Sequence, residues 1–170
     1  MTVHFATGEA LDKAPPHRSY ALLIDEKSTG TDGGTFSDGG WRVRDINNTA
    51  AVDTDGIVSF NASHNQAFIL SAGTYFIRWS APAYRVSKHQ SVLYKESGTQ
   101  TIYAYGSSER TSNGTAVVNR SFGQWRGTIT YNIHFQIRHQ CATTYSTSGF
   151  GLAGDFGTEV YTMVEIFKEY

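Results

Sequence analysis

The stretch GTITYNIHFQIRH, residues 127–139, alternates between apolar and polar side chains from Ile129 onward. A period of two places successive side chains on opposite faces of an extended chain, which predicts a β-strand with one buried and one polar face. We expect the buried face to carry Ile129, Tyr131, Ile133, Phe135 and Ile137. No part of the chain shows helical periodicity over a useful length, so the chain is expected to be a sheet protein.

Further short apolar runs are separated by turn sequences such as TDG, SAG, ESG and SNG. Aromatic residues make up 14% of the 170 residues, and this enrichment favours strands. No internal repeat is visible. Besides the first stretch, we expect strands at residues 19–25, 41–46, 56–60, 66–70, 74–80, 89–95, 101–106, 116–122 and 159–167. This pattern predicts an all-β, antiparallel β-sandwich of the jelly-roll type.

The length predicts one domain, preceded by a short arm. A chain of 170 residues suits a single domain that can bury a substantial core. Residues 1–18 contain Pro15 and Pro16, which force an extended path. We therefore interpret residues 1–18 as an N-terminal arm or linker and residues 19–170 as the jelly-roll domain.

The charge and cysteine content exclude several classes of protein. The net charge is −1 with no cluster of Lys and Arg, so we expect no nucleic-acid partner. No apolar run is long enough to span a bilayer, and the N-terminus lacks the apolar segment of a signal peptide, so we expect synthesis in the cytoplasm and no membrane insertion. The single cysteine, Cys141, cannot form an internal disulfide.

Residues 30–47, GTDGGTFSDGGWRVRDIN, place five glycines in the eleven residues before Trp41. A phosphate-binding loop would need a Gly-Lys-Ser/Thr step and a following helix, which are not seen here. A calcium loop would need more oxygen ligands than Asp32 and Asp38 supply. The run therefore predicts consecutive tight turns with glycine at positive φ, Gly33 included.

The strand after these turns begins with Trp41, which we expect to anchor it in the core. Asp45 is expected to pair with Arg44 or Arg42 at a solvated rim, an interaction worth less than about 1 kcal/mol.

No cofactor or metal site is predicted. His139 and Cys141 share a face of one strand and His134 faces the other way, but two ligands do not make a zinc site. Whether Asp53, Asp55 or the histidines hold an ion stays open. The G-x-S-x-G motif of a nucleophilic serine is not found, and no pair of carboxylates lies in a recognisable catalytic motif. We therefore expect no enzyme activity.

Aromatic side chains beside polar groups are the candidates for ligand binding. Such rings stack on sugars or proteins and keep a polar edge. The alternative is that they fill a second core or a subunit interface. The candidate residues are Tyr84, Tyr103, Tyr105, Trp125 and Arg126.

The last apolar run, residues 159–167, carries apolar side chains on both faces. Such a strand is either central in a sandwich or packs against a partner subunit.

Three stretches resemble the small surface domains of tailed-bacteriophage virions, with the overall layout of a C1q and tumour-necrosis-factor (TNF) type jelly roll. They are residues 30–47, 72–94 and 138–168. The resemblance implies a homotrimer with the last strand near the three-fold axis. The interface residues it implies are Tyr161, Met163 and Phe167, with Phe135 and Tyr131.

The resemblance further implies a non-enzymatic virion surface protein, a trimeric knob or tail fibre for attachment to a host receptor or glycan. Residues 1–18 would then bind other virion proteins. The alternative is a capsid decoration or head-fibre protein, in which seating on the shell is the function. A glycan-processing enzyme on the same scaffold is a third reading.

Overall fold

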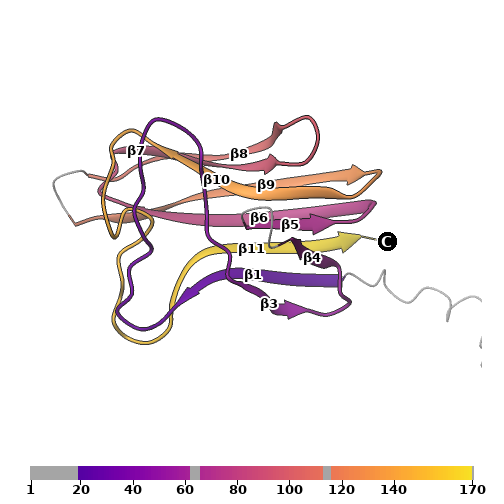
Figure 1. Cartoon of the computed structure of the whole chain (residues 1–170), viewed down its shortest axis with the longest axis horizontal. Helices are drawn as coiled ribbons and strands as arrows, with labels where there is room; N and C mark the ends of the chain where they lie inside the picture. Colours follow the sequence, from indigo (N-terminus) through magenta and orange to yellow (C-terminus); the bar gives the residue numbers. More distant parts are fainter. Residues whose placement is uncertain (1–18, 62–65, 113–115, 170) are drawn as a thin grey trace, which may run out of the picture.

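The computed structural model describes residues 19–61, 66–112 and 116–169, and these form eleven antiparallel β-strands without a helix. The strands build two sheets that pack face to face (Figure 1). The expected all-β antiparallel sandwich is confirmed. The predicted arm, residues 1–18, lies outside the described residues.

Sheet one has five strands and joins the first strand to the last. Its order is β3 (Asn48–Asp53), β1 (Ser19–Lys27), β11 (Glu159–Glu169), β6 (Gly73–Tyr84) and β9 (Val118–Ile129). The β1–β11 register runs from Ser19 opposite Lys168 to Lys27 opposite Glu159. The start of β1 and the end of the chain therefore lie at the same end of the sandwich, on the right in Figure 1.

Sheet two has six strands. Its order is β4 (Val58–Asn61), β5 (Ala67–Leu70), β10 (Ile133–Cys141), β7 (Lys88–Lys95) and β8 (Thr101–Arg110), and β2 (Arg42–Val43) pairs with β10. Strand order in both sheets departs from chain order, as in a jelly roll.

The core lies between the sheets and follows the alternation seen in the sequence. Ile133, Phe135 and Ile137 of β10 are buried against Phe68 of β5 and residues of sheet one. Each such side chain contributes roughly 1.5–3 kcal/mol by leaving water. Phe135 has no exposed surface, so the expectation that it lines a subunit interface is wrong.

The stretch 127–139 is not one strand. β9 ends at Ile129 in sheet one, and β10 begins at Ile133 in sheet two, so residues 130–132 carry the chain from one sheet to the other. Tyr131 lies in this crossing and is 54% exposed, although it continues the apolar alternation. Period two does not reveal where a strand leaves its sheet, because the residues on either side keep the same pattern.

Two long loops close the opposite end of the sandwich, on the left in Figure 1. Residues 28–41 and 142–158 pair through backbone hydrogen bonds from Gly33 to Gly151 at 2.9 Å and from Gly34 to Thr147 at 2.8 Å. We call this the loop end. A small second core lies beneath it, formed by Phe36, Ala83, Val86 and Cys141.

The glycine run makes these turns, but Gly33 does so for a different reason than expected. Gly30, Gly34 and Gly39 have positive φ, as predicted, whereas Gly33 does not. A Cβ at Gly33 would lie 2.8 Å from the carbonyl carbon of Phe150. Gly33 is therefore required by the close approach of the two loops.

Candidate functional site

The outer side of sheet one, which faces away from the core, carries large apolar side chains. Tyr20 of β1, Phe76 of β6 and Phe167 of β11 form a row, with the ring of Phe167 5.0 Å from that of Tyr20 and 6.1 Å from that of Phe76. Phe122 of β9 is 60% exposed, and Met163 of β11 is also exposed. We call these five residues the outer apolar face.

A depression of about 560 Å³ lies beside Phe122 and Met163. Tyr105, at the edge of sheet two and 60% exposed, forms another wall, and Gly123 is also among its lining residues. The face is thus hollowed beside protruding apolar groups, a shape that another protein surface can fill.

Charges on this face are already paired. Arg78 of β6 and Glu165 of β11 stand opposite each other, with a 2.9 Å contact between Nη2 and Oε2. Arg126 pairs with Glu169 at 2.6 Å. Because each cation has its own carboxylate, the face presents no uncompensated charge from these four residues to a partner.

Arg120 completes the face towards the loop end. Strands β6 and β11 pair as far as Ser80 and Met163, and the carbonyls of Val160 and Tyr161 lie beyond that pairing. Arg120 donates to both, at 3.1 Å and 2.6 Å. This half-buried guanidinium therefore supports the point where the two strands diverge.

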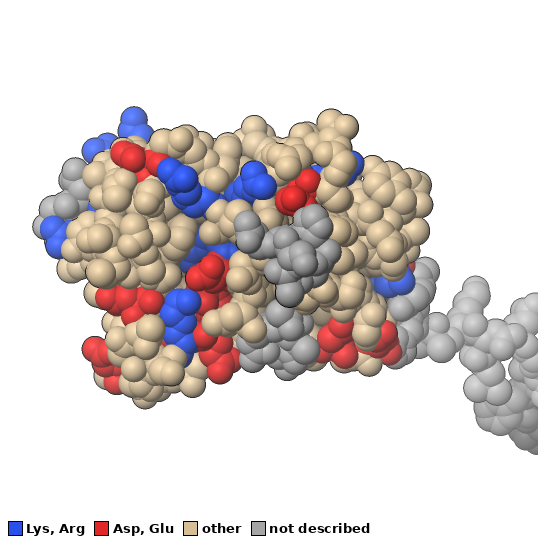
Figure 2. Space-filling view, in the orientation of Figure 1, with Lys and Arg blue, Asp and Glu red and all other residues tan. Residues whose placement is uncertain are grey.

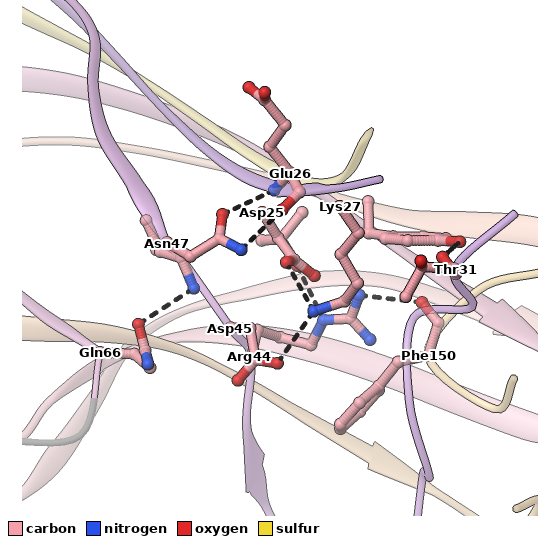
Figure 3. Close-up of polar contacts among 12 residues, drawn as sticks. Asp25, Glu26, Lys27, Thr31, Arg44, Asp45, Asn47, Gln66 and Phe150 are labelled. Carbon is pink, nitrogen blue, oxygen red and sulfur yellow. Dashed lines mark hydrogen bonds and ion pairs between the residues drawn. The ribbon is translucent and has the colours of Figure 1, made fainter. Parts of the chain in front are cut away.

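Arg44 lies inside the sandwich at the loop end and is 1% exposed (Figure 3). Its guanidinium donates to Thr162 Oγ1 at 2.8 Å, to the carbonyl of Phe150 at 3.0 Å and to the carbonyl of Pro82 at 3.3 Å. Burial lowers the pKa of Arg44 to about 9. The expected solvated rim pair is wrong for Arg44, whose side chain instead joins sheet one to the loop end.

Acidic groups lie near Arg44 (Figure 3). Asp25 is buried, and burial raises its pKa above the ordinary value, although Lys27 at 3.1 Å opposes that shift. Lys27 also reaches Asp45 at 3.5 Å. Asp25 and Asp45 favour the charged form of Arg44 through space, which partly offsets the desolvation of the guanidinium.

Trp41, which was expected in the core, is partly exposed instead. Its ring lies 6.5 Å from that of Tyr105 and belongs to neither buried cluster. The expectation that Trp41 anchors the strand is therefore wrong, and the buried anchor of this segment is Arg44.

A buried polar chain connects the sheets near Arg44. His89 Nδ1 and His139 Nε2 lie 2.9 Å apart, and His89 Nε2 lies 2.7 Å from Asn119 Oδ1. Because the Asn119 amide nitrogen donates a hydrogen bond to the carbonyl of Arg110, its Oδ1 accepts a hydrogen bond from His89 Nε2. With both rings neutral, His139 then donates to His89, which leaves His139 Nδ1 buried without a partner. Burial lowers the pKa of both histidines.

The loop end presents Phe156 to solvent. Phe156 is fully exposed, in a turn that Glu159 stabilises by accepting amide protons from Gly154 at 2.9 Å and Asp155 at 2.8 Å. These bonds lower the pKa of Glu159, so its carboxylate stays charged and the turn stays tied. Phe156 is thus displayed on an ordered loop.

The five predicted ligand residues do not form one site. Tyr84 is buried against Tyr145, and its candidacy as an exposed ring is wrong. Tyr103 and Trp125 are partly buried and pack on Phe135, so they extend the core. Tyr105 is exposed at the edge of β8, and Arg126 lies on the outer side of sheet one in its pair with Glu169.

Of the predicted interface residues, Met163 and Phe167 lie on the outer apolar face, where their role in an interface stays a prediction. Tyr161 lies under the loop end, covered by Gly151, and its hydroxyl donates to Thr31 at 2.7 Å. Tyr131 accepts a hydrogen bond from Lys95 at 2.9 Å. Sequence reasoning missed Tyr20, Phe76 and Phe122, which the alternation of β1, β6 and β9 against their buried neighbours could have revealed.

Within the described ranges, no three His, Cys, Asp or Glu side chains gather to hold a metal ion. No helix in that part of the chain could cross a membrane. Figure 2 shows acidic and basic side chains intermixed on the visible face, in keeping with the small net charge.

No protein-family profile and no curated protein matches the sequence. The fold is similar to that of murine APRIL at pH 5.0, with a TM-score of 0.57 and 9% identity over 89% of this chain and 99% of that one. It is also similar to Eiger TNF from S. frugiperda, with a TM-score of 0.52 and 8% identity over 88% and 92%. At such identities the likeness concerns the fold alone, and it defines a TNF-like jelly roll. The chain therefore shares the fold of that class of sandwich.

Proposed function

We propose that this chain is a trimeric, non-enzymatic attachment domain on the surface of a tailed-bacteriophage virion, binding a host receptor or glycan. The observation that carries the proposal is the outer apolar face. Phe122 and Met163 are exposed beside a depression, on a sheet whose inner side already covers the core. Exposed apolar side chains that gather beside a depression mark an interaction surface.

A second copy of the chain is the occupant that we propose for this face. The rim of one copy offers Tyr105 and Phe122, and its sheet offers Met163 and Phe167. Apolar groups on both sides, with the charges already paired within each copy, allow close packing without a new unpaired ion. Three binding sites on one trimer would strengthen weak single contacts through avidity.

The two ends of the sandwich suit this role. Residues 1–18 lead into Ser19, at the end opposite the loops that carry Leu152 and Phe156 (Figure 1). An arm bound to the virion would therefore leave the loop end facing outward. Aromatic residues such as Phe156 are enriched in protein–protein interfaces.

Light scattering on the purified chain tests the trimer. We expect three times 18.8 kDa, or 56.4 kDa. Phe122→Asp and Met163→Asp should give a monomer, because a buried unpaired carboxylate opposes association. Leu152→Asp changes an exposed apolar residue at the loop end, and this variant should remain a trimer. A wild-type monomer would overturn the proposal.

Capsid decoration is the alternative within the same trimer. An attachment protein should adsorb to susceptible cells and block infection, and Phe156→Asp should weaken adsorption. A decoration protein should instead bind empty capsids and lose that binding when residues 1–18 are deleted. Capsid binding without adsorption to cells would favour decoration.

A further inference from the structure

A second concave site lies on the outer side of sheet two, at its loop end, with a volume of about 520 Å³. Three adjacent strands contribute to it: Gln140 from β10, Lys88 from β7 and Arg110 from β8. Trp41 forms a wall. We call it the Trp41 pocket. It faces away from the core and none of the outer apolar face belongs to it.

Trp41 is held in place by the turn that precedes it. The neighbouring Arg42 donates to the carbonyls of Ser37 at 3.1 Å and Asp38 at 2.6 Å, which closes the loop ahead of the indole. The ring is partly exposed and neighbours Tyr105. An ordered, exposed indole offers a flat apolar surface on which a sugar ring can stack while its hydroxyls stay hydrated.

Lys88 and Arg110 stand directly opposite each other in the β7–β8 pair, and both are exposed. Like charges in opposed positions destabilise a sheet. Within the described part of the chain, neither of these cations contacts a carboxylate at ion-pair distance. The two cations therefore lie next to each other in the lining of the pocket, where a bound anion would offset their repulsion.

Glu109 is also among the residues that line the pocket, but its carboxylate does not reach Lys88 or Arg110 at ion-pair distance. Glu109 stands opposite the buried His89 in the same strand pair, so its side chain projects towards the other side of the sheet. There its carboxylate accepts a hydrogen bond from the Asn119 amide nitrogen at 3.4 Å. The amide of Gln140 is exposed in the pocket and is available for sugar hydroxyls.

We propose that the Trp41 pocket binds an anionic sugar, with the sugar ring stacked on Trp41 and its acidic group between Lys88 and Arg110. This rests on the proposed attachment function, and it names the class of glycan. Its location at the loop end, away from Ser19, leaves the pocket open to a cell surface when residues 1–18 are bound elsewhere.

The test is a ligand-observed NMR titration of the full chain with sugars matched except for one group. Galacturonic acid carries a carboxylate where galactose carries a hydroxymethyl, and galactose 6-sulfate carries a sulfate there. Glucuronic acid and N-acetylneuraminic acid are further sugars that carry a carboxylate. Acetate tests whether the anion binds without a sugar ring. Titration to about 20 mM covers the range of weak single-site binding.

We expect at least one acidic sugar to bind about tenfold more tightly than galactose and acetate, as a charge-assisted contact predicts. Comparison of the carboxylate sugars with galactose 6-sulfate then identifies which acidic group the pocket prefers. The double change Lys88→Gln and Arg110→Gln should reduce binding to the level of galactose. Trp41→Ala should abolish it, and Trp41→Phe should retain part of it. Lys168→Gln removes a cation opposite Ser19, at the far end of the sandwich from the pocket, and is the matched control.

Failure of every acidic sugar to bind, or equal binding of acetate, would overturn the inference. So would unchanged binding by the Lys88 and Arg110 double variant with an unchanged melting temperature. The proposed function fails by separate measurements, namely a monomeric mass or no adsorption to cells. A trimer that adsorbs to cells but does not bind these sugars would therefore overturn only the proposed sugar site.

Discussion

The guanidinium carbon of Arg44 lies 4.1 Å from the centre of the Phe150 ring, and the same guanidinium donates a hydrogen bond to the carbonyl of Phe150 at 3.0 Å. One side chain thus binds the loop 142–158 through both its backbone and its ring. Arg44 is itself held by Thr162 in sheet one. The loop end is therefore fastened to the sandwich by a residue more than one hundred positions away in the sequence.

Arg44→Met should destabilise the fold by about 3 kcal/mol. Methionine keeps much of the side-chain volume but leaves the carbonyls of Phe150 and Pro82 without their donor, and each unsatisfied buried group costs about 1–3 kcal/mol. Urea unfolding measures the change. Arg110→Met, at an exposed position, should stay within about 0.5 kcal/mol of wild type. A loss below 1 kcal/mol, on the scale of a rim contact, would contradict the anchoring role of Arg44.

The histidine pair should make the protein less stable in acid. Burial lowers the folded-state pKa of His89 and His139 below the ordinary 6.5, so the unfolded chain binds protons more readily. The full free energy of unfolding is therefore present above pH 6.5. It decreases as the pH falls from there through the folded-state pKa values of the two histidines. The nearby charges that act on the pair are Arg44, which disfavours protonation, and Glu109, which favours it at His89.

Melting temperatures between pH 7.5 and pH 5.5 test this expectation. His139→Gln keeps a donor towards His89 but removes one titrating group, so its melting temperature should fall less over this interval. His134→Gln, on the opposite face of β10 beside Glu96, should retain the wild-type fall. Equal falls in wild type and His139→Gln would show that the buried pair does not govern the acid response.

Gly33→Ala and Gly34→Ala should both destabilise the loop end, for different reasons. At Gly33 the new Cβ would meet the backbone of Phe150 and Gly151 at 2.8–2.9 Å, whereas at Gly34 it would meet nothing within 4 Å but φ is +104°. Overpacking costs about 1–3 kcal/mol and backbone strain a similar amount. Asn tolerates positive φ better than Ala, so Gly34→Asn should recover stability and Gly33→Asn should not. Thermal unfolding of the four variants distinguishes the two mechanisms.

Cys141 should react slowly with thiol reagents in the folded protein. It is buried under the loop end, and burial raises the pKa of its thiol to about 11, so little thiolate is present at pH 8. A colorimetric disulfide reagent should detect one thiol in urea and almost none in the native chain. Rapid reaction of the native protein would mean that the loop end opens readily.

Local patterns in the sequence are sufficient to predict the class of fold and much of the core. Alternation in residues 133–137 predicts β10 with Ile133, Phe135 and Ile137 on one face, and these side chains are buried. The dense glycines in residues 30–40 predict tight turns, and several of them have positive φ. These features are local: strand periodicity and turn geometry depend on neighbouring residues along the chain.

Only the tertiary structure shows which of several locally equivalent side chains are covered. Arg42 and Arg44 look equivalent in WRVRD, yet only Arg44 is buried, because Phe150 and Thr162 arrive from distant segments. A register shift in the β7–β8 pair puts Tyr103 against the core while Tyr105 stays exposed. Burial depends on the pairing of segments far apart in the chain, and no periodicity within either segment contains that information.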